Sequence, residues 1–180
     1  EFTTGYNNFL FLTLTGRNDW VSVLSANNRS YFYPGVSTSF IFNEAIPSLK
    51  NSRKLTFGKI FASWNRTGNV TLDPYKLNNP YSQINGFPFG NLVGFTPSSA
   101  YPNPDIKPEF VTSYEIGTQL SFFDHRSHFE GSYIYSDSEG QIFNATTSRA
   151  TGYSTAIVNA GRLTNNIIEL NVNSDIISKS

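Results

Sequence analysis

The chain has 180 residues, enough for one domain with a core, and its 13 basic residues balance its 13 acidic residues. This neutrality gives no excess of basic charge that would attract nucleic acid, and the lack of cysteine excludes disulfides and thiolate metal sites. Charged residues make up only 14% of the chain, against ~25% in an average soluble domain, while aromatic residues make up 16%. This composition favours strands and loops, and it suits a surface that meets lipid on one side.

Alternating apolar and polar side chains mark strands in the first third of the chain. We predict strands at residues 8–15, 31–42 and 55–65, because a period of two places alternate side chains on opposite faces. Residues 16–19 (GRND) are expected to end the first strand, and residues 43–54 to form a polar connection.

A long irregular tract follows at residues 66–107. It is rich in proline, asparagine and glycine, and it carries several aromatic side chains, among them Tyr75, Tyr81 and Phe95. A loop of this length inside a domain is usually functional or disordered, and its aromatic content argues against disorder. We therefore expect a functional surface loop.

The clearest strand of the chain covers residues 110–122. Aromatic and aliphatic side chains such as Tyr114 and Ile116 fall on one face, and polar ones such as Glu115 and Gln119 fall on the other. The run exceeds both the ~5–6 residues of an average strand and the ~9–11 that cross a bilayer. It is therefore either a strand of a large soluble sheet or part of a barrel wall with an apolar outside.

The last part of the chain continues the alternation. A tight turn at residues 124–127 is followed by a predicted strand at 128–136, which residues 140–144 are expected to prolong. A loop at residues 146–154 then leads to a last long strand at 156–173.

Two regularities of these elements bear on the class of protein. Short and long connections alternate, as in outer-membrane barrels, which have short periplasmic turns and long external loops. In addition, Lys59, Glu115, Glu130 and Glu169 all lie opposite the aromatic face, where they avoid the ~2–4 kcal/mol cost of a charge at mid-membrane. A soluble sheet with one buried face would show the same alternation. The pattern therefore shows which side chains share a face, but not whether the apolar face contacts lipid or a protein core.

The most specific motif is the segment 103–117, NPDIKPE followed by TSYEIG. It closely resembles the NPDLKPE…TSYEIG signature of TonB-dependent outer-membrane transporters. Other segments resemble the SusC/RagA-type branch of that family and follow the family's order: LTLTGRNDW at 12–20, YFYP at 31–34, ASW with TGN at 62–69, and TGY with NAG at 151–161.

The resemblance implies a barrel of roughly 22 strands with a plug inside. The expected fold class is all-β: an antiparallel transmembrane β-barrel segment of about six strands, with long external loops. Residues 1–180 would form a partial barrel domain, from which the plug, the TonB box and the closing strand are absent.

The resemblance also implies a function in transport rather than an enzyme activity. It implies import of oligosaccharides or peptides across a bacterial outer membrane, powered by the TonB complex, with a SusD-like surface lipoprotein closing over the barrel mouth. No cofactor is implied.

Two other functions stay open from the residues alone. One is a secreted, soluble β-sheet module that binds glycans. The other is a glycoside hydrolase, which would need two of Glu115, Glu130 and Glu169 to lie ~5–10 Å apart across a substrate. The histidines His125 and His128 flank a turn without accompanying ligands in the sequence, so we expect no metal site.

The substrate-binding candidates are aromatic and amide side chains in the predicted loops. Flat aromatic faces pack against sugar rings or peptide side chains, while amides supply hydrogen bonds. The alternative is that these side chains pack the loops against one another. The candidates are Trp20, Tyr75, Asn78, Tyr81 and Gln83.

Overall fold

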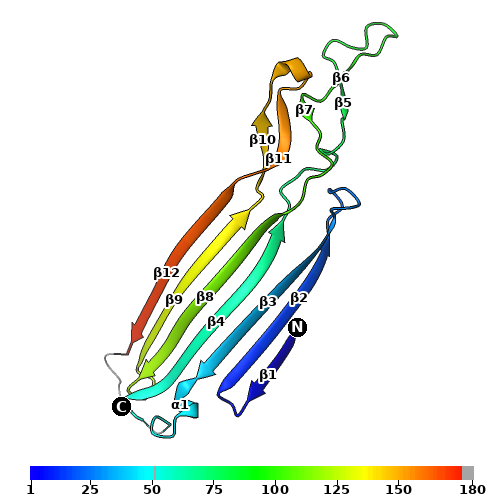
Figure 1. Cartoon of the computed structure of the whole chain (residues 1–180). Coiled ribbons are helices and arrows are strands. Elements are labelled where there is room, and N and C mark those ends of the chain that lie inside the picture. The colour runs from blue at the N-terminus through cyan, green and yellow to red at the C-terminus, as the bar shows by residue number, and fades with distance from the viewer. Residues whose placement is uncertain (51, 176–180) are drawn as a thin grey trace.

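A long antiparallel sheet makes up most of the chain, and two small sheets lie beyond one of its ends (Figure 1). The computed structural model describes residues 1–50 and 52–175, so residue 51 of the predicted connection 43–54 lies outside it. The main sheet has seven strands in the order β1-β2-β3-β4-β8-β9-β12. Their bounds are Phe2–Tyr6 (β1), Leu10–Trp20 (β2), Ser30–Ile41 (β3), Leu55–Asn69 (β4), Glu109–Phe122 (β8), Ser127–Glu139 (β9) and Arg162–Ser174 (β12).

The all-β, antiparallel expectation is confirmed, but the sheet holds seven strands where we predicted about six. The additional strand is β1, which pairs with β2 from Phe2–Leu14 to Tyr6–Leu10. Asn7 and Asn8 form the turn between them with φ of 47° and 59°. Asparagine tolerates this left-handed region, which a tight hairpin turn requires.

The prediction that residues 16–19 end the first strand is wrong. β2 continues through them to Trp20 and pairs with β3 up to Ser30. Gly16 leaves room on its face for the ring of Phe32, and Arg17 pairs with Asp19 along the strand at 2.6 Å. Cross-strand pairing therefore overrides the local turn signal in these polar residues.

The last predicted strand, 156–173, is in fact two strands. It divides into β11 (Thr155–Asn159) and β12, with Gly161 at φ 84° between them. Likewise, β10 (Ile142–Thr146) does not prolong β9; it pairs with β11 in a projecting hairpin that includes a 3-10 turn, η1 (Arg149–Thr151). The left-handed glycine turns the chain from the projecting hairpin into the main sheet.

The long tract predicted at residues 66–107 is shorter and more structured than expected. Its first residues belong to β4, which runs to Asn69. Three short strands follow: β5 (Tyr81–Gln83), β6 (Phe95–Pro97) and β7 (Ala100–Tyr101). β5 pairs with β6, and β7 pairs with β11 of the projecting hairpin.

Short and long connections lie at opposite ends of the main sheet, as predicted (Figure 1). The short-connection end has turns at residues 7–9 and 123–126 and a connection that contains α1 (Phe42–Ala45). The long-connection end carries residues 21–29, 70–108 and 140–161. No helix among the described residues is long and apolar enough to cross a bilayer.

One face of the main sheet is apolar across all seven strands. Trp64, Tyr114 and Tyr135 lie in one cross-strand row, and residues two apart along each strand share their face. The apolar side chains of this face include Phe2, Tyr6, Leu10, Leu12, Leu14, Val36, Phe40, Ile60, Trp64, Tyr114, Ile116, Leu120, Phe129, Tyr133, Tyr135, Ile168, Leu170 and Val172. Many of them are exposed, and so large an apolar patch indicates a non-aqueous neighbour.

The opposite face is mixed and polar. Lys59, Gln119, Glu130 and Asn171 form one cross-strand row on it. The register also places Glu115 and Glu169 on this face, which confirms the predicted position of all four strand-interior charges.

Candidate functional site

The long connections share a small hydrophobic core beyond the end of the main sheet. Its centre consists of Leu24, Ile106 and Ile157, which come from three different connections, and Ile106 is 0% exposed. Partly buried side chains around this centre include Val23 and Leu72 from the connections and Tyr31 from β3. The connections therefore pack into one unit that holds its surface residues in defined positions.

Asparagine side chains tie this unit together. The Asn159 amide nitrogen donates to the carbonyl oxygens of Lys107 at 2.7 Å and Gly140 at 2.8 Å, and its oxygen accepts from the Lys107 amide at 2.8 Å. Asn28 donates to the carbonyl of Ile106, and Asn103 to that of Ile157. The family-like motifs NPDIKPE and NAG thus meet through these hydrogen bonds.

Two of the predicted substrate residues lie together. Tyr75 and Asn78 line a cavity of about 390 Å³, with Leu24 and Pro104 also in its wall. Tyr75 has a left-handed backbone (φ 65°) and is 77% exposed, so its ring stands free at the cavity edge.

The other predicted substrate residues lie elsewhere. Tyr81 and Gln83 belong to β5, and the Gln83 amide donates to the carbonyl of Phe87 at 2.8 Å within the hairpin. Tyr81 is 68% exposed. Trp20 ends β2, is 71% exposed, and lies by register on the apolar face of the sheet rather than in the loop where we expected it.

A second cavity, of about 410 Å³, lies between the tract after β4 and the β10–β11 hairpin. Asp73 and Lys76 line it from one side, and Phe143, Asn144 and Thr155 from the other. Sequence reasoning did not identify these residues. The pairing that brings the two segments together is the short ladder of β7 with β11, for which the sequence offers no local signal.

Two of the three strand-interior carboxylates on the polar face accept hydrogen bonds from neighbouring side chains. Glu130 accepts from the Gln119 amide at 2.7 Å, and Glu115 accepts from the Ser63 hydroxyl at 3.4 Å. Since Glu130 pairs opposite Gln119, Glu115 lies four positions away along β8, roughly 14 Å at ~3.4 Å per residue. That distance exceeds the ~5–10 Å of a glycosidase carboxylate pair, so Glu115 and Glu130 do not form one. Glu169 pairs with Ser132 on β9 and is the diagonal neighbour of Glu130, at about 7–8 Å.

The two histidines stack with ring centroids 6.3 Å apart, and His128 shares a hydrogen bond of 2.9 Å with Ser121. Within residues 1–50 and 52–175, no three His, Cys, Asp or Glu side chains gather into a metal-binding group.

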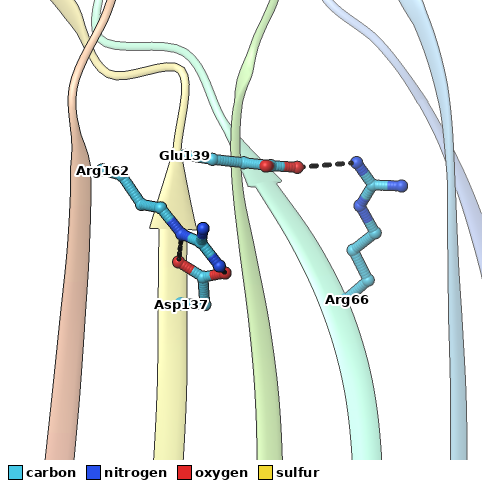
Figure 2. Close-up of polar contacts among 4 residues, drawn as sticks. All are labelled: Arg66, Asp137, Glu139 and Arg162. Atoms are coloured by element: carbon cyan, nitrogen blue, oxygen red, sulfur yellow. Dashed lines mark hydrogen bonds and ion pairs between the residues drawn. The ribbon is translucent and has the colours of Figure 1, made fainter.

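Four charged side chains form a cluster near the long-connection end of the main sheet (Figure 2). Arg162 binds both carboxylate oxygens of Asp137, at 2.8 and 2.6 Å, and Arg66 lies 3.5 Å from Glu139. By register, all four lie on the apolar face, beyond the row of Trp64, Tyr114 and Tyr135. The apolar band of the sheet therefore ends in aromatic rings and then in ion pairs.

This arrangement defines a class of protein. A meander of long antiparallel strands has an apolar face bordered by aromatic rings, a polar opposite face, and short and long connections at opposite ends. These are the features of the wall of a bacterial outer-membrane β-barrel.

The chain belongs to the TonB-dependent receptor β-barrel family: residues 2–176 match the family described as TonB dependent receptor-like, beta-barrel. Members of this family are outer-membrane receptors and transporters rather than enzymes. Two Formosa agariphila proteins, TonB-dependent receptor P26 and TonB-dependent receptor P3, are 30% and 28% identical over 93% and 94% of the chain. The chain spans 17% of the length of each of these curated relatives.

Solved structures share the fold. The RagAB peptide importer in the closed-closed state has a TM-score of 0.87 at 20% identity, over 97% of this chain and 19% of that one. The siderophore receptor PirA from Pseudomonas aeruginosa has a TM-score of 0.56 at 16% identity, over 92% of this chain and 28% of that one. Family membership confirms the resemblance drawn from the sequence, and it does not fit a secreted, soluble glycan-binding module.

Proposed function

We propose that this chain forms part of the wall and the extracellular mouth of a TonB-dependent importer of oligosaccharides or peptides. The observation that carries the proposal is the division of the sheet: the apolar face suits lipid, the polar face suits a wet lumen, and the long connections share one core at one end. Energy would come from the TonB complex, acting through a plug and a TonB box outside residues 1–180.

The mouth would contact substrate through the predicted residues. Tyr75 and Asn78 border one cavity and combine an exposed ring with an amide, a pairing that suits sugar rings and peptide bonds alike. Tyr81 and Gln83 lie outside this cavity, so we assign them a supporting contact at the rim. Trp20 lies on the apolar face, which we propose meets lipid, so we assign it no substrate contact. The similar RagAB structures are peptide importers.

The projecting β5–β6 hairpin would contact a SusD-like lipoprotein. Its tip exposes three large apolar side chains, Phe89, Leu92 and Val93. Apolar side chains gathered at a projecting tip favour a protein partner. The RagAB structures are described in closed-closed and open-open states, which supports a lid that moves at the mouth.

The test of import uses the full-length protein that contains this segment, expressed in cells with and without an active TonB complex. We expect TonB-dependent uptake of labelled oligopeptides or of labelled oligosaccharides, and reduced uptake in the double variant Tyr75→Ala/Asn78→Ala. The exposed loop variant Asn27→Ala, which lies outside the cavity lining, serves as the matched control. Uptake that persists without TonB, or no uptake of either class by an assembled barrel, would show the proposal to be wrong.

The lid contact has its own test. Replacing residues 84–94 with a two-residue Asn-Gly turn keeps β5 and β6 but removes the apolar tip. We expect the shortened protein to lose co-purification of the lipoprotein and to keep the Tyr75–Asn78 cavity, measured as unchanged substrate binding in detergent. Full retention of the lipoprotein would exclude the hairpin as its contact.

A further inference from the structure

The small sheet that projects beyond the long-connection end has an open strand edge. Its strand order is β10-β11-β7, so β10 pairs on one side only (Figure 1). The sequence of β10 is IFNAT, which lacks the charged residues and the proline that commonly protect an exposed edge. An edge of this kind offers backbone N–H and C=O groups to an added strand.

Two hydrogen bonds show which way the backbone groups of β10 point. The Thr147 amide, which continues the register of β10, donates to the Ser154 carbonyl on the β11 side. The Ile142 amide points the opposite way and donates to the Glu109 carboxylate at 2.8 Å. Since these directions alternate along an antiparallel ladder, the even-numbered residues of β10 direct their N–H and C=O groups away from β11.

Two residues of this outward-facing set have their hydrogen-bonding groups free. Asn144 and Thr146 are both exposed, and no backbone or side-chain group among the described residues bonds to their N–H or C=O groups. They lie two positions apart, as the outward groups of one strand must to pair with alternate residues of another strand. The edge can therefore accept a short ladder.

The cavity of about 410 Å³ lies under one face of the same hairpin. By register Asn144 and Ile157 share that face, and both line the cavity. Its other side is formed by Leu72, Asp73 and Lys76. A strand added beside β10 would direct alternate side chains to this face, where a partly apolar cavity can receive one of them. An open edge with an adjoining side-chain pocket is a recurring way to bind an extended peptide.

This cavity adjoins the proposed substrate contacts. Residues 71–73 and 76 line it, whereas residues 74, 75, 77 and 78 line the cavity that Tyr75 and Asn78 border. One stretch of the chain thus separates the two cavities. The open edge belongs to the same part of the mouth as the predicted substrate residues.

We propose that β10 binds the substrate as an added strand and that the substrate is an extended oligopeptide. The main-chain groups of Asn144 and Thr146 supply the hydrogen bonds, and peptides of any sequence without proline offer matching groups. An oligosaccharide has no alternating N–H and C=O groups to pair with such an edge. The inference rests on the proposed function in import and narrows its substrate class.

The experiment on the ligand uses the full-length protein in detergent and a labelled octapeptide blocked at both ends. One valine among serines fixes its register, because valine suits the partly apolar cavity. Two N-methylated forms remove the N–H groups of either the odd or the even residues. We expect one form to bind at least about tenfold more weakly and the other to bind like the unmodified peptide, because alternate residues of a strand face one side. Equal binding of the two forms would overturn the proposal.

The experiment on the protein separates backbone from side chain at one position. Asn144→Pro removes the outward N–H, and an edge strand tolerates proline there because this group takes no part in the ladder with β11. It should weaken octapeptide binding about tenfold, the effect of roughly one hydrogen bond. Asn144→Ala keeps the N–H and should bind normally. Equal weakening in both variants would place the contact on the side chain and overturn the proposal.

Hydrogen exchange of the unaltered protein gives a test that does not depend on the folding of a variant. The amides of Asn144 and Thr146 should exchange rapidly without the octapeptide and at least about tenfold more slowly with it. The Ala145 amide, which faces β11, should be slow in both conditions. Protection of Asn144 and Thr146 before peptide is added would show that the full-length protein already covers this edge, and would overturn the proposal.

A sugar probe distinguishes failure of this inference from failure of the proposed function. Labelled maltoheptaose should not slow exchange at Asn144 or Thr146. Binding of maltoheptaose without binding of the octapeptide would overturn the assignment of an oligopeptide. Import itself is judged by TonB-dependent uptake, which that outcome would leave intact.

Discussion

Tyr114 on β8 lies directly opposite Tyr135 on β9, and their ring centroids are 6.2 Å apart on the apolar face. Toward the short-connection end the face continues with Ile116 and Tyr133, and toward the long-connection end it changes to Asp137 and Glu139. The two tyrosines therefore mark the extracellular border of the membrane band, where amphipathic rings are favoured.

If the apolar face meets lipid, the effect of a new charge on stability should depend on which face of the strand carries it. Ile116→Arg places a charge in the middle of the apolar face and should destabilise the assembled barrel by ~2–4 kcal/mol. Gln119→Arg, on the polar face of the same strand and beside Glu130, should assemble normally. Urea unfolding of the full-length protein in lipid vesicles measures both. Equal stabilities would mean that the apolar face does not meet lipid.

Glycines on neighbouring strands should differ in tolerance of a methyl group. A Cβ added at Gly117 would collide with the Phe61 ring and lie 2.9 Å from the carbonyl oxygen of Gly131, so Gly117→Ala should cost about 1–3 kcal/mol by overpacking. A Cβ at Gly131 would meet only flexible side-chain atoms at 3.2 Å, so Gly131→Ala should cost clearly less. The same unfolding measurement ranks them, and the reverse order would contradict the packing of Phe61 over Gly117.

The loop core predicts a local rather than a global effect. Ile106 is fully buried, so Ile106→Ala should weaken the packing of residues 70–108 by about 2–5 kcal/mol while the main sheet stays intact. Hydrogen exchange followed by mass spectrometry should show faster exchange in residues 21–29 and 70–108. Leu92→Ala, at a residue 68% exposed, is the control. Unchanged exchange in Ile106→Ala would show that the connections do not depend on this core.

Replacing the amide of Asn159 with a carboxylate should destabilise the packed connections. Asn159→Asp keeps the shape of the side chain but replaces the donor that reaches the carbonyls of Lys107 and Gly140. The carbonyl oxygens of Lys107 and Gly140 would then face an acceptor instead of a donor. Each unsatisfied contact should lower the stability of the packed connections by about 1–3 kcal/mol. Limited proteolysis should cut the connection before β8 sooner than in the control Asn91→Asp. Equal cleavage rates would show that the Asn159 bridge is dispensable.

Several features of the wall could be predicted from short stretches of sequence. The alternation at residues 110–122 predicted the two faces of β8, and the positions of Lys59, Glu115, Glu130 and Glu169 predicted the polar face. Strand ends were less predictable. The polar residues Gly16–Asp19 carry a turn signal, but their pairing with β3 continues the strand, and pairing partners are not visible locally.

The candidate sites also depend on contacts between distant segments, which the sequence does not show. Tyr75 and Asn78 could be proposed from their residue types, but the cavity they border also needs Leu24 and Pro104 from distant segments. The charged cluster was not predicted at all. Its one local signal was that Asp137 and Glu139 continue the spacing of Tyr133 and Tyr135 on one face.

The sequence by itself determined which strand side chains lie on the apolar and polar faces, because alternation with a period of two is a local property of the chain. It also determined the family, because the motif is contiguous. Only the tertiary structure decided which residues meet across strands. Arg66, Asp137 and Arg162 come from three strands, and Leu24, Ile106 and Ile157 from three connections. Their proximity follows from the register of the antiparallel ladders, which is set by backbone hydrogen bonds and packing between segments far apart in the chain.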